Sequence, residues 1–213
     1  MNKAILVHGF NKDSMDMDPL KRHLNLLRYE CILKDFPITY KEFDMAAFIL
    51  EGVLEEVIEN SVDDKEKINL IGHSTGGLVI RKFLSETKYI DKINRCVLIA
   101  TPNQGSSLAN IANKFKPYTS IYKTLKSLTY DYIEKMDLKH RSNVEIGAIA
   151  GNVSNLLLGN LMSEENDGRV EVSSVYYPDL KDFIILPYGH KEIHHQQETA
   201  KLIDAFLQSG KFN

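Results

Sequence analysis

A short apolar segment of the chain ends in a turn rich in glycine and then gives way to a helical pattern. Residues Ile68–Gly77 read I-N-L-I-G-H-S-T-G-G, and apolar residues at helical spacing resume at Leu78. A buried strand that turns abruptly at G-x-S-x-G into a helix predicts a nucleophile elbow. Gly72 and Gly76 provide room, because so sharp a turn brings neighbouring backbone too close for a Cβ atom. The pattern therefore predicts an enzyme active site centred on Ser74.

Strand-like and helix-like segments alternate along the rest of the chain. Short, continuous apolar runs are typical of buried parallel strands, and between them apolar residues recur at helical spacing. Strands separated by helices predict an α/β fold, a mostly parallel sheet with helices on both faces. The expected strands are Lys3–Val7, Cys31–Phe36, Ile68–Ile71, Ile93–Ala100, Val144–Ala150 and Phe183–Leu186, and the expected helices include Leu78–Ser85 and Ile193–Leu207.

Length and charge narrow the classes of protein. The chain has 213 residues and a formal net charge of −3, with acidic and basic residues interspersed. We expect a single domain over residues 1–213, because no repeat or linker divides the sequence. The charge pattern gives no footprint for nucleic acid or an anionic membrane. The chain opens with an apolar strand and has no stretch long enough to span a bilayer, so we expect a cytoplasmic protein without a membrane anchor.

We expect neither a cofactor nor a metal ion. The patterns G-x-x-x-x-G-K and G-x-G-x-x-G, which bind phosphates, are both missing. Cys31 and Cys96 lie in apolar runs, which favours buried free thiols. A metalloenzyme is an alternative because His190 and His194 are four residues apart, but H-K-E-I-H differs from the zinc motif H-E-x-x-H.

Residues 105–140 depart from the alternation of strands and helices. They contain no convincing strand, combine apolar and aromatic residues with lysines, and include Pro117. A long excursion in a compact domain is usually a lid or a binding element. The segment follows the strand Ile93–Ala100 and so leaves the sheet at the same edge as Ser74. We expect a helical insertion over the active-site entrance; helices packed on the rim for stability alone are the alternative.

A serine hydroxyl needs a base to take its proton, and the base needs a third group to hold it. In open α/β sheets these groups come from loops at the carboxyl ends of strands. His190 lies directly after the last expected strand and is the expected base. His194 and His195, in the first turn of the last expected helix, are the alternatives, of which His194 is favoured. Ordinary polar or packing roles are expected for the remaining histidines, which are His8, His23, His73 and His140.

The acid is expected to follow a strand beyond the elbow. Asp167 comes after the strand Val144–Ala150 and directly precedes Gly168, which is consistent with a tight turn that aims a carboxylate inward. An Asp-Gly turn in a surface loop is the alternative explanation. The other candidate acids are Glu164, Glu165 and Asp179.

A tetrahedral intermediate also needs an oxyanion hole, built from two backbone N–H groups. The residue after the nucleophile, Thr75, is expected to supply one of them. The loop after the first strand must pass the elbow, and His8-Gly9-Phe10 begins that loop. We therefore expect the second N–H group to be that of Phe10.

Together these motifs resemble those of the α/β-hydrolase fold, and within it those of small bacterial lipases and lipase-like esterases. The resemblance covers nearly the whole chain. It implies that Ser74 is the nucleophile, Asp167 the acid and His190 the base, in the chain order that this fold uses, with Phe10 and Thr75 as the oxyanion hole. The matching segments are H-G-F at His8–Phe10, G-H-S-T-G-G at Gly72–Gly77, A-T-P-N-Q-G-S at Ala100–Ser106, N-D-G-R-V-E-V-S-S at Asn166–Ser174 and G-H-K-E-I-H-H at Gly189–His195.

The resemblance implies a serine hydrolase of class EC 3.1.1, which cleaves small-molecule carboxylic esters through an acyl-enzyme. A thioesterase or amidase with the same triad is the alternative, as is a non-catalytic binding protein of the same fold. Two features differ from larger members. Little chain precedes Lys3, which predicts a sheet of only about six strands. The loop Asn11–Asp18 is polar and acidic rather than rich in glycine, which leaves the second oxyanion donor open.

Overall fold

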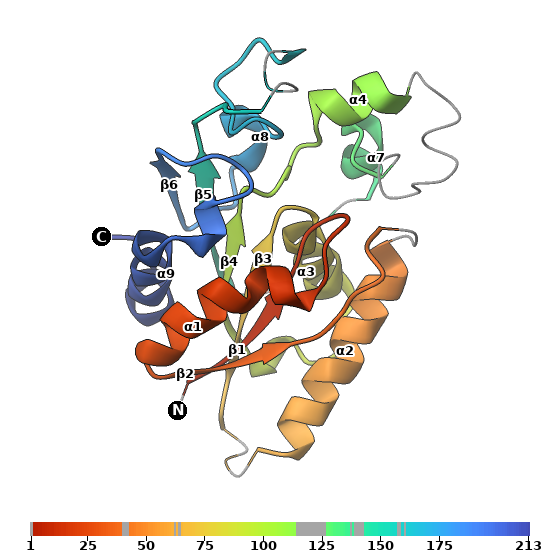
Figure 1. Ribbon diagram of the computed structural model, residues 1–213. Coiled ribbons are helices and arrows are strands. Elements are labelled where there is room, and N and C mark those ends of the chain that lie inside the picture. Colours follow the sequence, from red (N-terminus) through yellow and green to blue (C-terminus); the bar gives the residue numbers. More distant parts are fainter. Residues whose placement is uncertain are drawn as a thin grey trace.

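The protein contains a six-stranded sheet in which all neighbouring strands are parallel, in the order β2-β1-β3-β4-β5-β6 (Figure 1). The computed structural model describes residues 2–39, 43–61, 63, 65–113, 127–136, 138, 143–156, 159 and 161–213. The strands are β1 (Asn2–Val7), β2 (Tyr29–Leu33), β3 (Ile68–His73), β4 (Ile93–Ile99), β5 (Glu145–Gly151) and β6 (Asp182–Leu186).

The central strands are mostly apolar because both of their faces are buried. In β1, Ile5 and Val7 belong to one hydrophobic core, whereas Ala4 and Leu6 belong to the other. Successive side chains of a strand point to opposite faces of its sheet, so each central strand must supply apolar residues to both cores. This explains why these strands appear in the sequence as continuous rather than alternating apolar runs.

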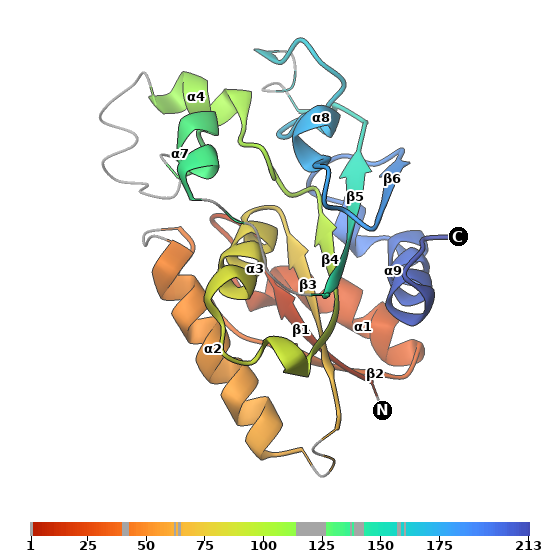
Figure 2. The same cartoon turned by 180° about the vertical axis from the view of Figure 1, so that it is seen from behind.

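Helices cover both faces of the sheet. Helices α1 (Asp18–Leu26) and α9 (Gln197–Ser209) contact each other over one core, and α2 (Phe43–Glu59) and α3 (Thr75–Glu86) contact each other over the other (Figures 1 and 2). Among the helices in the described parts of the chain, none has both the length and the apolar character needed to cross a bilayer. The arrangement confirms the expected α/β fold with about six strands.

The strand order creates a switch point at the centre of the sheet. From β1 the chain moves to one side to form β2, and it then crosses to the other side to form β3. The loops that follow β1 and β3 therefore separate toward opposite faces, and in open α/β sheets ligands bind at such a point. Three shorter helices, α4 (Ser107–Asn113), α7 (Tyr130–Lys135) and α8 (Val172–Val175), lie beyond the carboxyl ends of β4 and β5 (Figure 1).

The predicted elements end at somewhat different residues in the structure, and the differences in two of them bear on the site. The expected strand Cys31–Phe36 is Tyr29–Leu33, because the Phe36 N–H donates to His8 Nε2 (3.0 Å) instead of joining the sheet. The expected helix Ile193–Leu207 is divided at Gln196, which is extended (φ −81°, ψ 138°). A short 3₁₀ turn, η4 (Ile193–His195), precedes this break. His194 and His195 therefore lie in this 3₁₀ turn and not in the first turn of α9, and their rings bond to Asp16.

Both cysteines are free and buried, as expected. Cys31 lies on the edge strand β2 and Cys96 on the central strand β4. Burial raises the pKa of the Cys31 thiol to about 12, so this thiol stays protonated and unreactive near neutral pH. The two side chains therefore act as small apolar groups in the packing.

Candidate active site

Ser74 occupies a sharp turn between β3 and α3. Its backbone has φ 54° and ψ −126°, a conformation that is strained for a residue with a side chain. A Cβ atom on Gly76 would lie 2.3 Å from the Val7 carbonyl oxygen, and one on Gly72 would lie 2.6 Å from the Gly77 nitrogen. Both contacts involve backbone that cannot move aside, so these two positions require glycine.

The Ser74 side chain begins a line of two hydrogen bonds. Its Oγ lies 3.0 Å from His190 Nε2, and His190 Nδ1 lies 2.8 Å from Asp167 Oδ2. A carboxylate only accepts, so Nδ1 carries the proton and Nε2 is left to accept from the serine hydroxyl. All three residues are buried. The imidazole is therefore held in the tautomer that can remove a proton from Ser74.

Asp167 is fixed by its own turn. Its Oδ1 accepts from the backbone N–H groups of Arg169 (3.0 Å) and Val170 (2.8 Å), and its carbonyl accepts from the His190 N–H (2.9 Å). Gly168 has φ +95°, in the region that favours glycine. The Asp-Gly turn thus leaves Oδ2 free to face the imidazole.

The alternative acids lie elsewhere. Glu164 accepts a hydrogen bond from the Ser173 hydroxyl, and Glu165 accepts from the Asn152 amide (2.8 Å). Asp179 lines a separate pocket beside Arg81. Neither the two glutamates nor Asp179 forms a hydrogen bond with His190 among the described residues.

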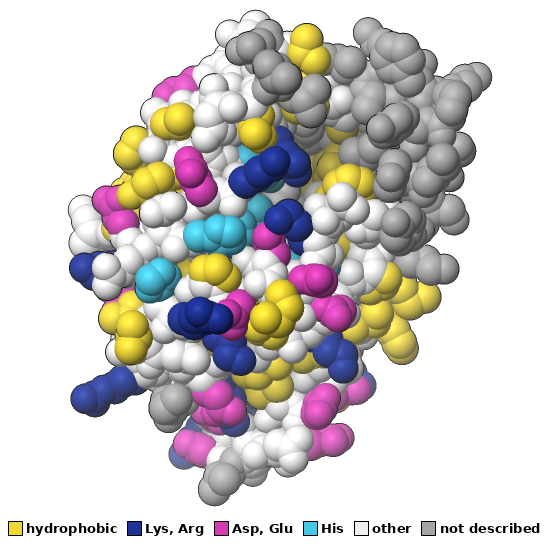
Figure 3. Space-filling view, viewed as in Figure 1, with side chains coloured by type: hydrophobic (Ala, Val, Ile, Leu, Met, Phe, Trp, Pro, Cys, Tyr) yellow, Lys and Arg dark blue, Asp and Glu magenta, His cyan; other side chains and the backbone are white. Residues whose placement is uncertain are grey.

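The loop after β1 passes beside the serine. A Cβ atom on Gly9 would lie 3.0 Å from the Ser74 Cβ, and Phe10 and Ser74 line the same small pocket. Thr75 is the first residue of α3, where helical N–H groups lack partners within the helix. The two predicted oxyanion donors therefore belong to segments that meet at Ser74. Figure 3 shows histidine, lysine and arginine side chains close together on this side of the molecule.

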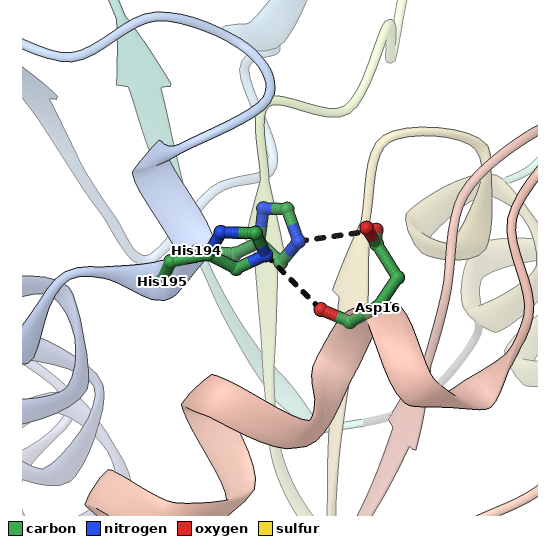
Figure 4. A group of neighbouring side chains, drawn as sticks. All are labelled: Asp16, His194 and His195. Carbon is green, nitrogen blue, oxygen red and sulfur yellow. Dashed lines mark hydrogen bonds and ion pairs between the residues drawn. The ribbon is translucent and has the colours of Figure 1, made fainter.

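The stacked imidazole rings of His73 and His194 lie next to His190 and are bonded to its backbone through His73. His73 Nε2 donates to the His190 carbonyl oxygen (3.0 Å), and the His73 ring stacks on that of His194 with centroids 3.7 Å apart. His194 Nε2 in turn donates to Asp16 Oδ2 (3.1 Å), as Figure 4 shows. His194, the alternative base, is therefore bonded to Asp16 and not to Ser74. The stack connects the backbone of His190 to a carboxylate at the start of the chain.

Asp16 was missed by the sequence analysis, which noted only that its loop is acidic. Burial raises the pKa of its carboxyl group, but hydrogen bonds from His194 and Lys12 outweigh this and hold that pKa below its usual range. His195 Nε2 donates to the Asp16 carbonyl oxygen (3.1 Å). Asp16, His194 and His195 are the group of described residues that could ligate a metal ion (Figure 4). An ion there would have to displace Lys12, whose Nζ lies 2.5 Å from Oδ1.

Three buried histidines have lowered pKa values. Burial disfavours the charged imidazole of His8, whose ring instead bonds to the Gly9 carbonyl and the Phe36 N–H. Burial and the neighbouring His194 and His190 place the pKa of His73 well below 6.5. Burial also lowers the pKa of His194, although Asp16 partly opposes the shift. All three rings are therefore neutral at neutral pH.

These lowered pKa values predict a loss of stability in weak acid. In the unfolded chain a histidine takes up a proton near pH 6.5, whereas the folded protein binds that proton only at lower pH, so acidification favours unfolding. We expect the free energy of unfolding to fall below about pH 6.5, by up to about 1.4 kcal/mol per pH unit for each histidine. Urea unfolding at several pH values measures the slope. His73→Gln, which can still donate to the His190 carbonyl, should make the slope shallower, and an unchanged slope would contradict this explanation.

The all-parallel sheet, the sharp strand-to-helix turn at Ser74 and the helices on both faces define the α/β-hydrolase fold. The chain belongs to the family described as the PGAP1-like alpha/beta domain, which matches residues 8–170. That match includes Ser74 and Asp167 and ends before His190. No protein with a curated description matches the sequence.

Solved structures of lipases and esterases have the same fold. The mature lipase BlEst2 of Bacillus licheniformis is similar with a TM-score of 0.81 and 19% identity, over 99% of this chain and 92% of that one. The metagenomic carboxyl esterase MGS0156 has a TM-score of 0.79 and 15% identity, over 98% and 76% of the two chains. The phospholipase PlaB of Legionella pneumophila has a TM-score of 0.75 and 16% identity, over 99% and 60%.

Proposed function

We propose that the protein is a serine hydrolase that cleaves small-molecule carboxylic esters, an activity of class EC 3.1.1. One observation carries the proposal. His190 Nε2 lies 3.0 Å from Ser74 Oγ, while its Nδ1 lies 2.8 Å from a buried Asp167 carboxylate. This arrangement of nucleophile, base and orienting acid is the one that acyl transfer requires. The lipase and esterase activities named for the similar structures are consistent with it.

The proposed reaction begins with attack by Ser74 Oγ on the ester carbonyl carbon as His190 Nε2 takes the hydroxyl proton. Asp167 stabilises the imidazolium that forms. The carbonyl oxygen becomes an oxyanion, which the N–H groups of Thr75 and Phe10 stabilise. The C–O bond to the alcohol then breaks, and the departing alkoxide receives the proton from His190. An acyl-enzyme on Ser74 remains.

Water completes the cycle. His190 takes a proton from a water molecule, whose oxygen attacks the acyl carbon of the ester on Ser74. The second tetrahedral intermediate uses the same N–H groups and collapses as His190 returns the proton to Ser74 Oγ. The free carboxylic acid leaves. The same steps apply to a thioester or an amide. Rates measured on an ester, a thioester and an amide of the same acyl group would show which leaving group the protein prefers.

Replacement of Ser74 tests the proposal. A fluorophosphonate reacts only with an activated serine, so it should label the protein at this residue. Ser74→Ala should abolish labelling and lower the turnover of p-nitrophenyl acetate by several orders of magnitude, because only binding and the oxyanion hole remain. Near-normal hydrolysis by this variant would contradict the mechanism, and a wild-type protein that is not labelled would favour a non-catalytic binding protein.

Two histidines distinguish the proposed base from its alternative. His190→Ala should be as damaging to turnover as Ser74→Ala, because members of a triad act as a unit. Asp167→Asn should cost somewhat less. His194→Ala removes a ring that is bonded to Asp16, and it should leave fluorophosphonate labelling detectable. If His194→Ala abolishes labelling while His190→Ala keeps it, the base is wrongly assigned.

We also propose that the segment 105–140 covers the active-site entrance and forms part of the acyl pocket. Its described helices α4 and α7 lie beyond the carboxyl end of β4, from which the segment leaves the sheet (Figure 1). The Ser106 N–H donates to the Leu128 carbonyl (2.9 Å). This bond joins the part of the segment that leads into α4 to the part that leads into α7. Residues 114–126, 137, 139 and 140 of this segment lie outside the described residues.

A change in chain-length preference tests this role. Leu108→Ala removes apolar surface from α4 and should lower kcat/KM for p-nitrophenyl decanoate more than for the acetate, with labelling of Ser74 retained. Leu26→Ala is the matched control, because Leu26 is 78% exposed on α1. An identical preference in both variants would favour a purely structural role for the segment.

A further inference from the structure

The pocket that contains Ser74 is rich in positive charge. Three of the side chains that line it are cationic and one is a carboxylate, whereas the whole chain carries a net charge of −3. Figure 3 shows lysine and arginine side chains beside the histidines on this face. The lining residues are Gly9, Phe10, Lys12, Asp16, His73, Ser74, Arg169, His190, Lys191 and His194.

Two of the three cations are not neutralised by an ion pair. Lys12 pairs with Asp16, the carboxylate of the pocket (2.5 Å). Neither Arg169 nor Lys191 forms an ion pair within the part of the chain that the structure describes. His73 and His194 also line the pocket, but they add no positive charge to it, because burial keeps both rings neutral. Among the side chains that line the pocket, a surplus of two positive charges therefore remains; the buried Asp167 carboxylate, behind His190, lies outside this lining.

Both cations are placed by the same turns that place the proposed acid and base. The Arg169 N–H donates to Asp167 Oδ1 (3.0 Å), and Lys191 directly follows His190. Arg169 is partly buried, so water screens its charge less than that of an exposed residue. The backbone positions of Arg169 and Lys191 are thus tied to those of the proposed acid and base.

We propose that the substrate carries an anionic group, a carboxylate or a phosphate, close to the ester that Ser74 attacks. The inference rests on the proposed function and adds a substrate class to it. An arginine guanidinium group can donate two parallel hydrogen bonds to a carboxylate or a phosphate, and a lysine ammonium group adds a positive charge. Opposite charges in a small pocket also raise the local concentration of a charged substrate. The anion-binding groups are Arg169 and Lys191.

Pairs of esters that differ only in charge test the inference. On the alcohol side, 4-acetoxybenzoate is compared with its neutral methyl ester; on the acyl side, the monophenyl ester of adipic acid is compared with methyl phenyl adipate. The measured quantity is the ratio of kcat/KM for the anionic ester to that for its neutral partner. Intrinsic reactivities differ within a pair, so the ratio is compared between protein variants. The pair of esters whose ratio changes between the variants shows whether the substrate carries its anionic group on the alcohol side or on the acyl side.

The variant Arg169→Gln/Lys191→Gln should lower this ratio about tenfold for one of the pairs, because it removes both unpaired charges. The control variant Lys201→Gln/Lys211→Gln makes the same change in net charge at exposed positions outside the pocket and should keep the ratio. Lys191→Gln alone, at an exposed position, should lower the ratio by a smaller factor and serves if the double variant does not fold. Added salt should lower the wild-type ratio as well.

Equal ratios in the wild type and the pocket variants would overturn the inference, as would an equal fall in the control variant. If fluorophosphonate labels Ser74 and the neutral esters are hydrolysed, such a result leaves the proposed function intact. A wild-type protein that is neither labelled nor active on any of the esters would overturn both.

Discussion

The site depends on a close contact between the backbones of two segments that follow neighbouring strands. Gly76, in the first turn of α3, approaches the Val7 carbonyl so closely that a Cβ atom would lie 2.3 Å from its oxygen. This contact brings the end of β1 against the elbow and places Gly9 beside Ser74. Any side chain at Gly76 would separate the two segments, and the pocket would lose one wall. A steric limit on one atom therefore decides whether Ser74 and the loop beside it can meet.

Burial of polar groups around this contact has a cost that hydrogen bonds only partly offset. His73 and His194 each use Nε2 for one hydrogen bond, and the Nδ1 atoms of both rings are buried without a hydrogen-bond partner among the residues that the structure describes. A buried, unsatisfied polar atom typically costs about 1–3 kcal/mol. The stacked rings nevertheless hold the backbone of His190 in place. The same residues thus lower the free energy of unfolding and fix the geometry of the site. Asp16, with hydrogen bonds to two side chains, is the better satisfied end of this network.

Much of the fold could be predicted from the sequence because its central strands are buried on both faces and appear as apolar runs. The edge strand β2 was placed less well, since the Phe36 N–H bonds to His8, a partner 28 positions away. The residues in the hydrogen-bonded line from Ser74 were selected by one topological rule, that working groups follow the carboxyl ends of strands. Their catalytic roles stay predictions.

Contacts between distant parts of the chain could not be predicted. The bond between Asp16 and His194 spans 178 positions, and periodicity alone did not reveal the break between η4 and α9 that follows His195. Arg169 and Lys191 were also missed, although each lies within two residues of a proposed triad member. Their closeness in sequence to Asp167 and His190 could have identified them, because the backbone of a residue beside a fixed acid or base is itself held near that group.

The separation in sequence has a consequence for the nascent protein. Ser74 is synthesised 116 residues before His190, and Asp16 is synthesised 178 residues before His194. Until the segment that carries His190 and His194 has left the ribosome, the Ser74 hydroxyl has no imidazole beside it and the first loop has no stacked imidazoles to bind. Pairings of such long range form late, because the entropy of closing the intervening chain must be overcome first. A chain that lacks this segment would therefore carry the strained turn at Ser74 without its hydrogen-bonded partner, and the proposed mechanism could not operate in it.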